Sequence, residues 1–285
     1  MTVSYSLVAW NAQGFNVRGR SALARSSAST WQVLGSHYMR PLWDDTSDAT
    51  GPFLLAGLTE AGKPPSFSLG PKSKTVKKAT RRGSFTGSSK FKLNYNWYGW
   101  SKGGKNLRCS LCALQAVPSP AVTGYPTRSV TAKPMANAIR PPLIGAYSGA
   151  QTLIVALVHL NSGASFRSNN FRALSNLANA LEAMGRPAII MGDINIDIGG
   201  EATSDVLDDF AAKKGTVTNW DVLRTDASTQ ISGGELDWAL AYNCANTTAM
   251  QLGPLSSAAT PYGRGLGYVA RGVSDHAVVA YTLDA

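Results

Sequence analysis

The chain has 285 residues, of which 44% are hydrophobic, so it can bury a substantial core and lacks the composition of a disordered protein. Its 27 Lys and Arg residues against 17 Asp and Glu give a net charge of +10, which indicates a negatively charged partner. No run of about 18 apolar residues is present, which argues against a transmembrane helix. No signal peptide is visible before the first strand-like run.

Short apolar runs alternate with amphipathic segments along the chain, which predicts an α/β protein. We expect strands at about 4–10, 91–95, 108–117, 153–158, 188–191, 236–242 and 277–283, and another that ends near Leu58. Helices are expected at about 22–34, 169–184 and 204–214, and the proline-rich segment 118–142 is expected to be a surface excursion. The strand, helix and strand within 153–191 form the clearest unit, because apolar residues recur at helical spacing from Phe171 to Met184 and Gly185 supplies the stop.

The segment from Ala61 to Leu181 contains no Asp or Glu but holds 17 of the 27 basic residues. We expect a single domain over residues 1–285, with residues 62–92 forming a basic loop inserted into it. Three interpretations of this loop stay open: a grip on phosphates, a nuclear-import cluster, or a solvated surface. Its densest part comprises Lys72, Lys74, Lys77, Lys78, Arg81 and Arg82.

Polar residues follow the expected strands at several separate points, where α/β folds place their sites. Asn11, Glu60 and His159 each follow an apolar run, Gly192-Asp193-Ile194-Asn195 follows another, and Ser274-Asp275-His276 precedes the last strand. This set of carboxylates, carboxamides and imidazoles suits metal-assisted hydrolysis of a phosphodiester.

The residue types also suggest individual roles at such a site. Glu60, Asp275 and Asn11 offer the hard oxygen ligands that suit Mg²⁺. Asp237 is a candidate to orient His276, since an imidazole needs an acceptor to act reliably as an acid or base. Asp193 and Asn195 lie two apart, so on extended backbone they would face the same way and could hold a water and a phosphoryl oxygen together.

Other hydrolytic sites lack support in the sequence. There is no His-Glu-x-x-His for a zinc protease and no Gly-x-Ser-x-Gly elbow for a serine hydrolase. The three cysteines argue against a disulfide framework. Cys109 and Cys112 fall in an expected strand, where residues three apart point to opposite faces, so we expect neither a bridge nor a shared metal.

At these residues the chain resembles the endonuclease/exonuclease/phosphatase superfamily, to which deoxyribonuclease I belongs, and within it the catalytic B subunits of cytolethal distending toxins. The matching motifs occur in the family's order over residues 8–283. They are Trp10-Asn11-x-Gln13-Gly14, Glu60-Ala61-Gly62, Val158-His159, Gly192-Asp193-x-Asn195, Leu236-Asp237 and Ser274-Asp275-His276.

The resemblance implies a four-layer α/β sandwich, with two mixed β-sheets packed face to face and helices on the outside. It also implies a Mg²⁺-dependent nuclease, with Mn²⁺ or Ca²⁺ as candidate substitutes. Glu60 would be the main metal ligand with Asn11 and Asp275 nearby, and His159 and His276 would be catalytic, with the acid and base roles between them left open.

Two arginines also match the toxin family's pattern, and one residue differs from it. Arg108 and Arg140 match positions that would contact the scissile or neighbouring phosphates. The toxin family commonly has Arg after its Gly-Asp-x-Asn motif, whereas this chain has Ile196, so one phosphate contact is missing or replaced.

The function expected is endonucleolytic cleavage of DNA with little sequence preference, because phosphate contacts carry no base information. A phosphoinositide phosphatase on the same core and a catalytically inactive binding subunit are the alternatives. DNA is the expected partner, and toxin delivery subunits are a further candidate. The expected location is the nucleus of a target cell, reached as a secreted or delivered bacterial toxin, and the alternative is the cytoplasm.

Overall fold

The computed structural model describes residues 2–11, 53–59, 76–82, 91–99, 108–116, 142–148, 151–214, 219–230, 233–252 and 276–285. The expected helix at 22–34 and the excursion at 118–142 lie outside these residues, apart from Pro142. No helix within the described part of the chain is long and apolar enough to cross a membrane.

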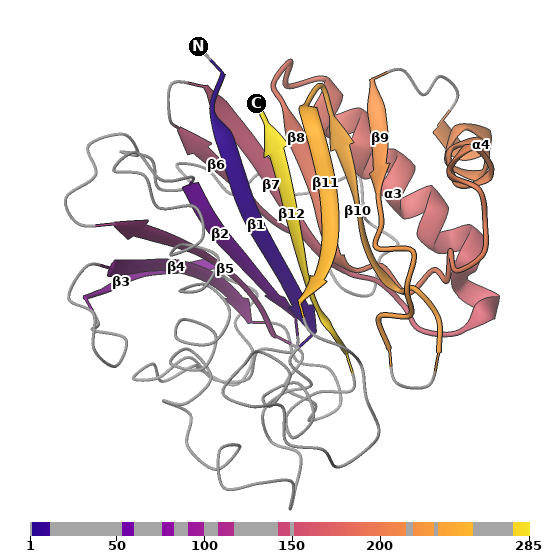
Figure 1. Ribbon diagram of the computed structural model, residues 1–285, viewed down its shortest axis with the longest axis horizontal. Helices are drawn as coiled ribbons and strands as arrows, with labels where there is room; N and C mark the ends of the chain where they lie inside the picture. Colours follow the sequence, from indigo (N-terminus) through magenta and orange to yellow (C-terminus); the bar gives the residue numbers. More distant parts are fainter. Residues whose placement is uncertain are drawn as a thin grey trace, which may run out of the picture.

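Two β-sheets form the centre of the molecule (Figure 1). The seven-stranded sheet has the order β11-β12-β1-β2-β5-β4-β3, and the five-stranded sheet has the order β6-β7-β8-β10-β9. Strands β1 and β2 pair in parallel, as do β7 and β8, whereas their other neighbours are antiparallel. Both sheets are therefore mixed, as the resemblance implied.

The strand bounds follow the order of the chain. The larger sheet is built from β1 (Ser4–Asn11), β2 (Phe53–Thr59), β3 (Val76–Arg82), β4 (Phe91–Gly99), β5 (Arg108–Ala116), β11 (Ala245–Leu252) and β12 (Val278–Asp284). The smaller sheet is built from β6 (Leu143–Ser148), β7 (Thr152–His159), β8 (Ala188–Asp193), β9 (Trp220–Leu223) and β10 (Asp237–Tyr242).

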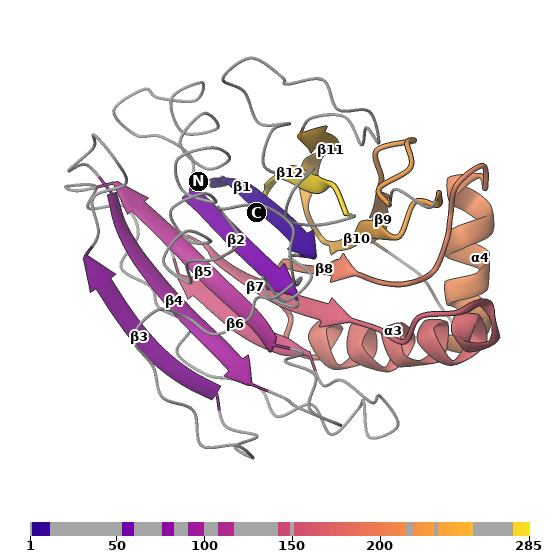
Figure 2. The ribbon, with the colours of Figure 1, turned by 90° about the horizontal axis from the view of Figure 1, so that it is seen from below.

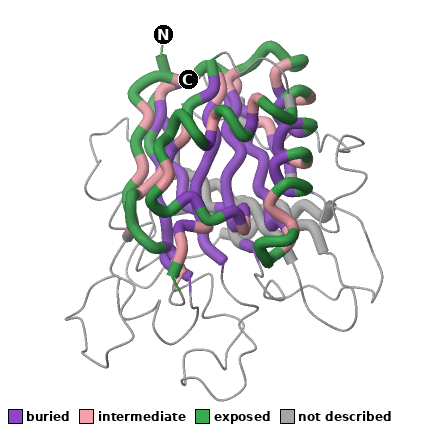
Figure 3. Tube along the Cα trace, turned by 90° about the vertical axis from the view of Figure 1, so that its right-hand side faces the viewer, coloured by how far each residue is buried: buried purple, intermediate pink, exposed green. Residues whose placement is uncertain are grey.

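The sheets pack face to face through alternating apolar residues of their inner faces. Leu7 and Ala9 of β1 and Tyr281 of β12 meet Val155 of β7 and Met191 of β8 in one buried cluster. Figure 3 shows the strands of this interface as largely buried. This packing fixes the ends of β1 and β8 relative to each other.

Two helices cover the outer face of the five-stranded sheet (Figure 2). Helix α3 (Arg167–Glu182), preceded by the short 3₁₀ helix η4 (Ala164–Phe166), packs with α4 (Thr203–Lys214) on a second apolar cluster. Phe171, Leu174 and Leu181 of α3 are buried there with Ile190 of β8, at the positions that the helical spacing predicted. The described residues thus supply three of the layers of an α/β sandwich.

Four strands were not foreseen in the sequence: β3, β6, β9 and β11. Strand β3 lies inside the expected loop 62–92, so that part of the prediction was wrong; its sequence VKKATRR offers no apolar alternation to mark a strand. Strand β9 has only four residues, and much of β11 is polar and exposed. Strands β3, β9 and β11 are each defined by pairing with a neighbour, since none has a clear apolar pattern of its own.

The close approach of the sheets yields a stability prediction at Gly57. A Cβ at this position would lie 2.7 Å from Leu157 Cδ1 and 2.8 Å from Met191 Cε. We expect Gly57→Ala to lower the free energy of unfolding by about 1–3 kcal/mol, because a side chain must be displaced in a closely packed interface. Urea denaturation of Gly57→Ala, Leu157→Ala and the double variant should show a double-variant loss smaller than the sum. Strict additivity would contradict the contact.

Candidate active site at the strand ends

Three of the expected site residues lie on adjacent strands of the five-stranded sheet. His159 ends β7 and is the parallel register partner of Asp193, which ends β8. Asp237 begins β10 and is the antiparallel register partner of the same aspartate. All three side chains are buried. The pairing register therefore brings together residues that are up to 78 positions apart in the sequence.

The seven-stranded sheet contributes two further groups to this edge. Asn11 ends β1, and its Nδ2 donates to Asp193 Oδ2 at 2.7 Å. His276 lies just before β12, and its carbonyl accepts from Trp10 Nε1 at 3.3 Å. The structure thus brings together five predicted residues, Asn11, His159, Asp193, Asp237 and His276, from both sheets.

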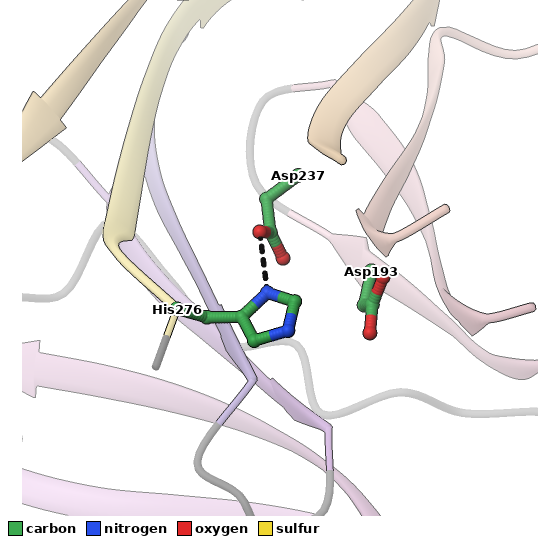
Figure 4. A group of neighbouring side chains, drawn as sticks. All are labelled: Asp193, Asp237 and His276. Carbon is green, nitrogen blue, oxygen red and sulfur yellow. Dashed lines mark hydrogen bonds and ion pairs between the residues drawn. The ribbon is translucent and has the colours of Figure 1, made fainter. Parts of the chain in front are cut away.

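Asp237 and His276 form the oriented pair that the sequence suggested. The imidazole Nδ1 and the carboxylate Oδ2 are 2.8 Å apart, and the second ring nitrogen lies on the side of Asp193 (Figure 4). The buried Thr229 helps to place both partners, because its hydroxyl accepts from the backbone N–H of Asp237 at 2.9 Å and its carbonyl accepts from that of Ala277 at 2.7 Å. The hydrogen bond to Asp237 fixes the ring orientation and favours a protonated imidazole.

Asp193 is the most perturbed acid at this edge. The pKa of its carboxyl is raised to about 7, mainly by burial and also by the neighbouring Asp237 carboxylate, while His276 and the amides of Asn11 and Asn195 act in the opposite direction. His159 Nε2 is 3.4 Å from Asp193 Oδ2. A carboxyl that titrates near neutral pH is suited to accept and release a proton during a reaction.

Asn195 lies beside Asp193, but not in the way that the sequence suggested. Strand β8 ends at Asp193, and Asn195 has a positive φ of 54°, so the two residues do not share an extended backbone. The amide Nδ2 of Asn195 donates to the carbonyl of Leu160 at 3.1 Å, which joins the segments that follow β7 and β8. Asparagine tolerates this backbone region better than most residues, and Asn195 lies beyond the end of the strand rather than on it.

Gly192 is required by the same close approach of β7 and β8. Its φ is 128°, and a Cβ there would lie 2.3 Å from the carbonyl oxygen of Val158. Glycine alone avoids both the strained backbone and this overlap. The glycine of the Gly-Asp-x-Asn motif is thus a structural condition for bringing His159 and Asp193 into register.

Two supporting residues were not identified from the sequence. The buried Asn170 of α3 donates through Nδ2 to the carbonyl of Asn161 at 2.8 Å and approaches the carbonyl of Ile194 at 3.4 Å, so it ties the helix to both loops behind the site. Thr229 is the second. A buried asparagine within an apolar helix face was the available signal for Asn170, whereas nothing in the sequence marked Thr229.

Ile196, the departure from the toxin pattern, belongs to the core. Its side chain is buried in the apolar cluster between the five-stranded sheet and the helices. Its carbonyl accepts from Trp238 Nε1 at 2.9 Å. An arginine in this orientation would bury its charge, so this chain uses the position for packing rather than for a phosphate contact.

The site at this edge of the sheets has oxygen atoms that could bind a hard cation. Oδ1 of Asp193 and Oδ1 of Asp237 are buried and have no hydrogen-bond partner among the described residues. One ligand atom from each of Asp193, Asp237 and His276 lies within 4.8 Å of the others. Carboxylate oxygens are the ligands that Mg²⁺ prefers, and a cation would offset two adjacent negative charges.

The remaining predicted residues are only partly placed. Glu60, Asp275 and Arg140 lie outside the described residues, although Glu60 directly follows Thr59, the register partner of Asn11. Arg108 is the first residue of β5, which runs antiparallel to β2 and begins at the edge where β1 and β2 end. Their roles at the site stay predictions.

The chain is similar in structure to solved cytolethal distending toxin and TDP2 structures. No protein-family model and no curated protein matches its sequence. CdtB, the biologically active subunit of cytolethal distending toxin, superposes with a TM-score of 0.60 at 18% identity, covering 97% of this chain and 96% of that one. The toxin from Actinobacillus actinomycetemcomitans gives 0.58 at 14% identity, covering 97% of each chain. D. rerio TDP2, in complex with a single-strand DNA product, gives 0.55 at 13% identity, covering 99% of each chain.

These likenesses confirm the expected fold, the α/β sandwich of the deoxyribonuclease I-like superfamily. They extend over almost the whole chain, although fewer than one residue in five is identical. The fold therefore accounts for the arrangement of the strand ends, while the chemistry depends on the side chains described above.

The pKa of Asp193 predicts how stability depends on pH. The value of about 7 exceeds the ordinary 3.8, so between those values the folded protein holds a proton that the unfolded chain has released. The stability from this group is complete below about pH 4 and is lost as pH rises through about 7, a change on the order of a few kcal/mol. Urea denaturation with EDTA from pH 5 to pH 8 should show this fall for the wild type relative to Asp193→Asn. Parallel curves for the two proteins would contradict the raised pKa.

Proposed function

We propose that the chain is a divalent-metal-dependent phosphodiesterase that cleaves DNA endonucleolytically with little sequence preference. The observation that carries the proposal is the convergence of Asn11, His159, Asp193 and the Asp237–His276 pair at one edge of two packed sheets. The structural neighbours support it, since one is a toxin subunit and another is bound to a DNA product. The chain's excess of basic residues supports a polyanionic substrate.

The cation is proposed to be Mg²⁺, with Mn²⁺ or Ca²⁺ as substitutes. Asp193 and Asp237 supply carboxylate oxygens in the described part of the site, and the amide oxygen of Asn11 together with Glu60 and Asp275 would complete the set. A bound cation would offset charge on the phosphoryl oxygens and the leaving oxygen. The two buried, unpartnered carboxylate oxygens are the observation that fits it.

Each side chain of the site has a separate role in the proposed hydrolysis. Asn11 holds Oδ2 of Asp193 in place, so that the carboxylate would orient the attacking water beside the cation. Asp237 holds His276 and stabilises its protonated form beside the developing charge. His159 ends β7, which flanks β8 on the side away from β10. It is placed to hydrogen-bond the phosphate or the departing oxygen.

A genotoxin role is part of the proposal and rests on the likeness to the toxin subunits. In that role the chain would act in the nucleus of a target cell, with toxin delivery subunits as partners. Nuclear DNA breaks after introduction of the wild type, and their absence with a His159→Ala variant, would support it. A phosphoinositide phosphatase and an inactive binding subunit are alternative outcomes of the assay that follows.

Plasmid relaxation tests the activity directly. The wild type with Mg²⁺ should convert supercoiled plasmid to nicked and linear forms, and EDTA should abolish the reaction. His159→Ala should lower the rate by about 100-fold or more, because an acid, base or donor at the reacting phosphate is lost. His37→Ala is the matched control, since His37 is the third histidine of the chain and belongs to no motif.

Activity that survives both EDTA and His159→Ala would overturn the assignment. Release of phosphate from a phosphoinositide at rates far above DNA cleavage would replace the nuclease with a phosphatase. Mg²⁺ binding without turnover of any phosphoester would indicate an inactive binding subunit.

Asp237 is a positioning residue whose effect should be kinetic. We expect Asp237→Asn to reduce kcat by 10²- to 10⁴-fold, on the order of the loss seen when an orienting aspartate becomes an amide, with little change in KM. The pH profile of kcat should also lose the limb that reports His276. Asp226→Asn, a matched change at an aspartate that is 80% exposed, should leave both unchanged. Equal losses in kcat for the two variants would contradict this role.

A further inference from the structure

Glu235 is a buried acid that the proposed reaction does not use. It lies two positions before Asp237 and is only 1% exposed. Its Oε2 accepts from Arg224 Nη2 at 2.8 Å, and its Oε1 accepts from the backbone N–H and the hydroxyl of Thr225 at 2.6 and 3.1 Å. A buried carboxylate is costly unless its oxygens are bonded in this way, so the fold keeps this charge at a fixed place.

These bonds close the connection between β9 and β10 at its base. Strand β9 ends at Leu223, and β10 begins at Asp237. Arg224 and Glu235 therefore lie near the two ends of the connection between these strands. Their side chains are 9% and 1% exposed, so a buried ion pair holds the start and the end of the connection together.

The same pair ties the connection to the segment that follows β8. Arg224 Nη1 donates to the carbonyl of Glu201 at 2.6 Å, and its Nη2 donates to that of Ile198 at 3.0 Å. In return, Asp197 Oδ1 accepts from the backbone N–H of Glu235 at 2.9 Å. The base of the connection is thus fixed against residues just beyond the strand that carries the other acid of the site.

The middle of the connection contacts the segment that carries His276. Gln230 forms an isolated antiparallel bridge with His276, and the carbonyl of Thr229 accepts from the backbone N–H of Ala277 at 2.7 Å. The N–H of Thr229 donates in turn to the carbonyl of Gly234, next to the base, at 2.9 Å. The connection therefore leads into the acid that orients the imidazole and also holds the backbone of the imidazole itself (Figure 4).

We propose that Glu235 is a positioning residue, which sets the geometry of the Asp237–His276 pair by keeping the connection closed at its base. This inference rests on the proposed function and adds to it a residue outside every motif of the site. Catalytic groups must be held within about 0.5 Å of their productive geometry by residues that are themselves fixed by hydrogen bonds. Glu235 meets this condition, because both of its carboxylate oxygens and its backbone N–H are bonded.

Glu235→Gln tests this role with little change in shape. The amide oxygen can still accept from Thr225, but the amide nitrogen would face Arg224 Nη2, so that two donors would meet in place of an ion pair. With bis(p-nitrophenyl) phosphate and Mg²⁺, kcat should fall by about 10- to 100-fold, because small displacements of a catalytic group have effects of this size. KM should change by less than about twofold, since the substrate contacts are kept.

Glu182→Gln is the matched control. Glu182 is the last residue of α3, and its Oε1 accepts from Trp220 Nε1 at 2.9 Å. The variant thus removes the same charge from a hydrogen-bonded carboxylate outside the connection, and its kcat should stay at the wild-type value. Equal losses in the two variants, or a wild-type kcat in Glu235→Gln, would overturn the proposal.

The His276 imidazole gives a readout that does not depend on turnover. The proton between its Nδ1 and Asp237 should give a low-field NMR signal in EDTA, assigned by its loss in His276→Gln. A buried and fixed hydrogen bond slows exchange of such a proton with water. The signal should persist in Glu182→Gln and should broaden or vanish in Glu235→Gln at the same pH; an unchanged signal would overturn the proposal.

This signal also separates the proposal from the function on which it rests. Absence of hydrolysis by the wild type would contradict the proposed function. Loss of the signal in Glu235→Gln alone would still support the positioning of the imidazole.

Arg224→Lys provides the test if Glu235→Gln does not fold, as judged by circular dichroism. Lysine keeps a cation opposite Glu235 but offers one nitrogen in place of two for the carbonyls of Glu201 and Ile198. Its kcat should fall by about threefold to tenfold, because the base of the connection is held less firmly. A wild-type kcat and an unchanged His276 signal in Arg224→Lys, together with an unfolded Glu235→Gln, would show that Glu235 serves the fold alone and would overturn the proposal.

Discussion

The structure of the site depends on two buried carboxylates that the sheet register forces together. Asp193 and Asp237 are antiparallel register partners, and they are 2% and 0% exposed. Two like charges removed from water repel each other strongly, so the fold must supply compensation. Asn11 donates to one carboxylate, His276 pairs with the other, and His159 lies within 3.4 Å of the first. Burial and the Asp237 carboxylate still raise the pKa of Asp193 to about 7.

The compensation requires both sheets to be in place. Asn11 and His276 come from the seven-stranded sheet, whereas Asp193 and Asp237 come from the five-stranded one. Glycines at Gly57 and Gly192 permit the approach between the sheets and between β7 and β8. The apolar clusters thus stabilise the fold and also set the distances between the groups that carry the chemistry.

Much of this arrangement could be predicted because the decisive residues follow strands with clear apolar patterns. His159 and Asp193 follow β7 and β8, and parallel strands place their carboxyl ends at one edge. The Asn11 to Asp193 hydrogen bond could not be predicted, since it depends on how two sheets pack rather than on spacing within the chain. The backbone at Asn195 was predicted wrongly for a related reason: the motif shows residue types, while the end of β8 is set by its neighbours. Strand β3 was missed because charge conceals its pattern and pairing with β4 defines it.

Ile196 belongs to the core at a position where the toxin pattern commonly has an arginine. The side chain packs the five-stranded sheet against its helices, so this position supplies no cation to the site. The cations are concentrated in the segment from Ala61 to Leu181, which contains no acid and includes β3, β4 and β5 of the larger sheet and β6 and β7 of the smaller one. The carboxylates of the described site come from β8 and β10 of the smaller sheet. The groups proposed for proton transfer come from both sheets, since His276 precedes β12 and Asp193 ends β8. The ends of β1 and β8, held together by Asn11 and Asp193, are where the two sheets meet at the site.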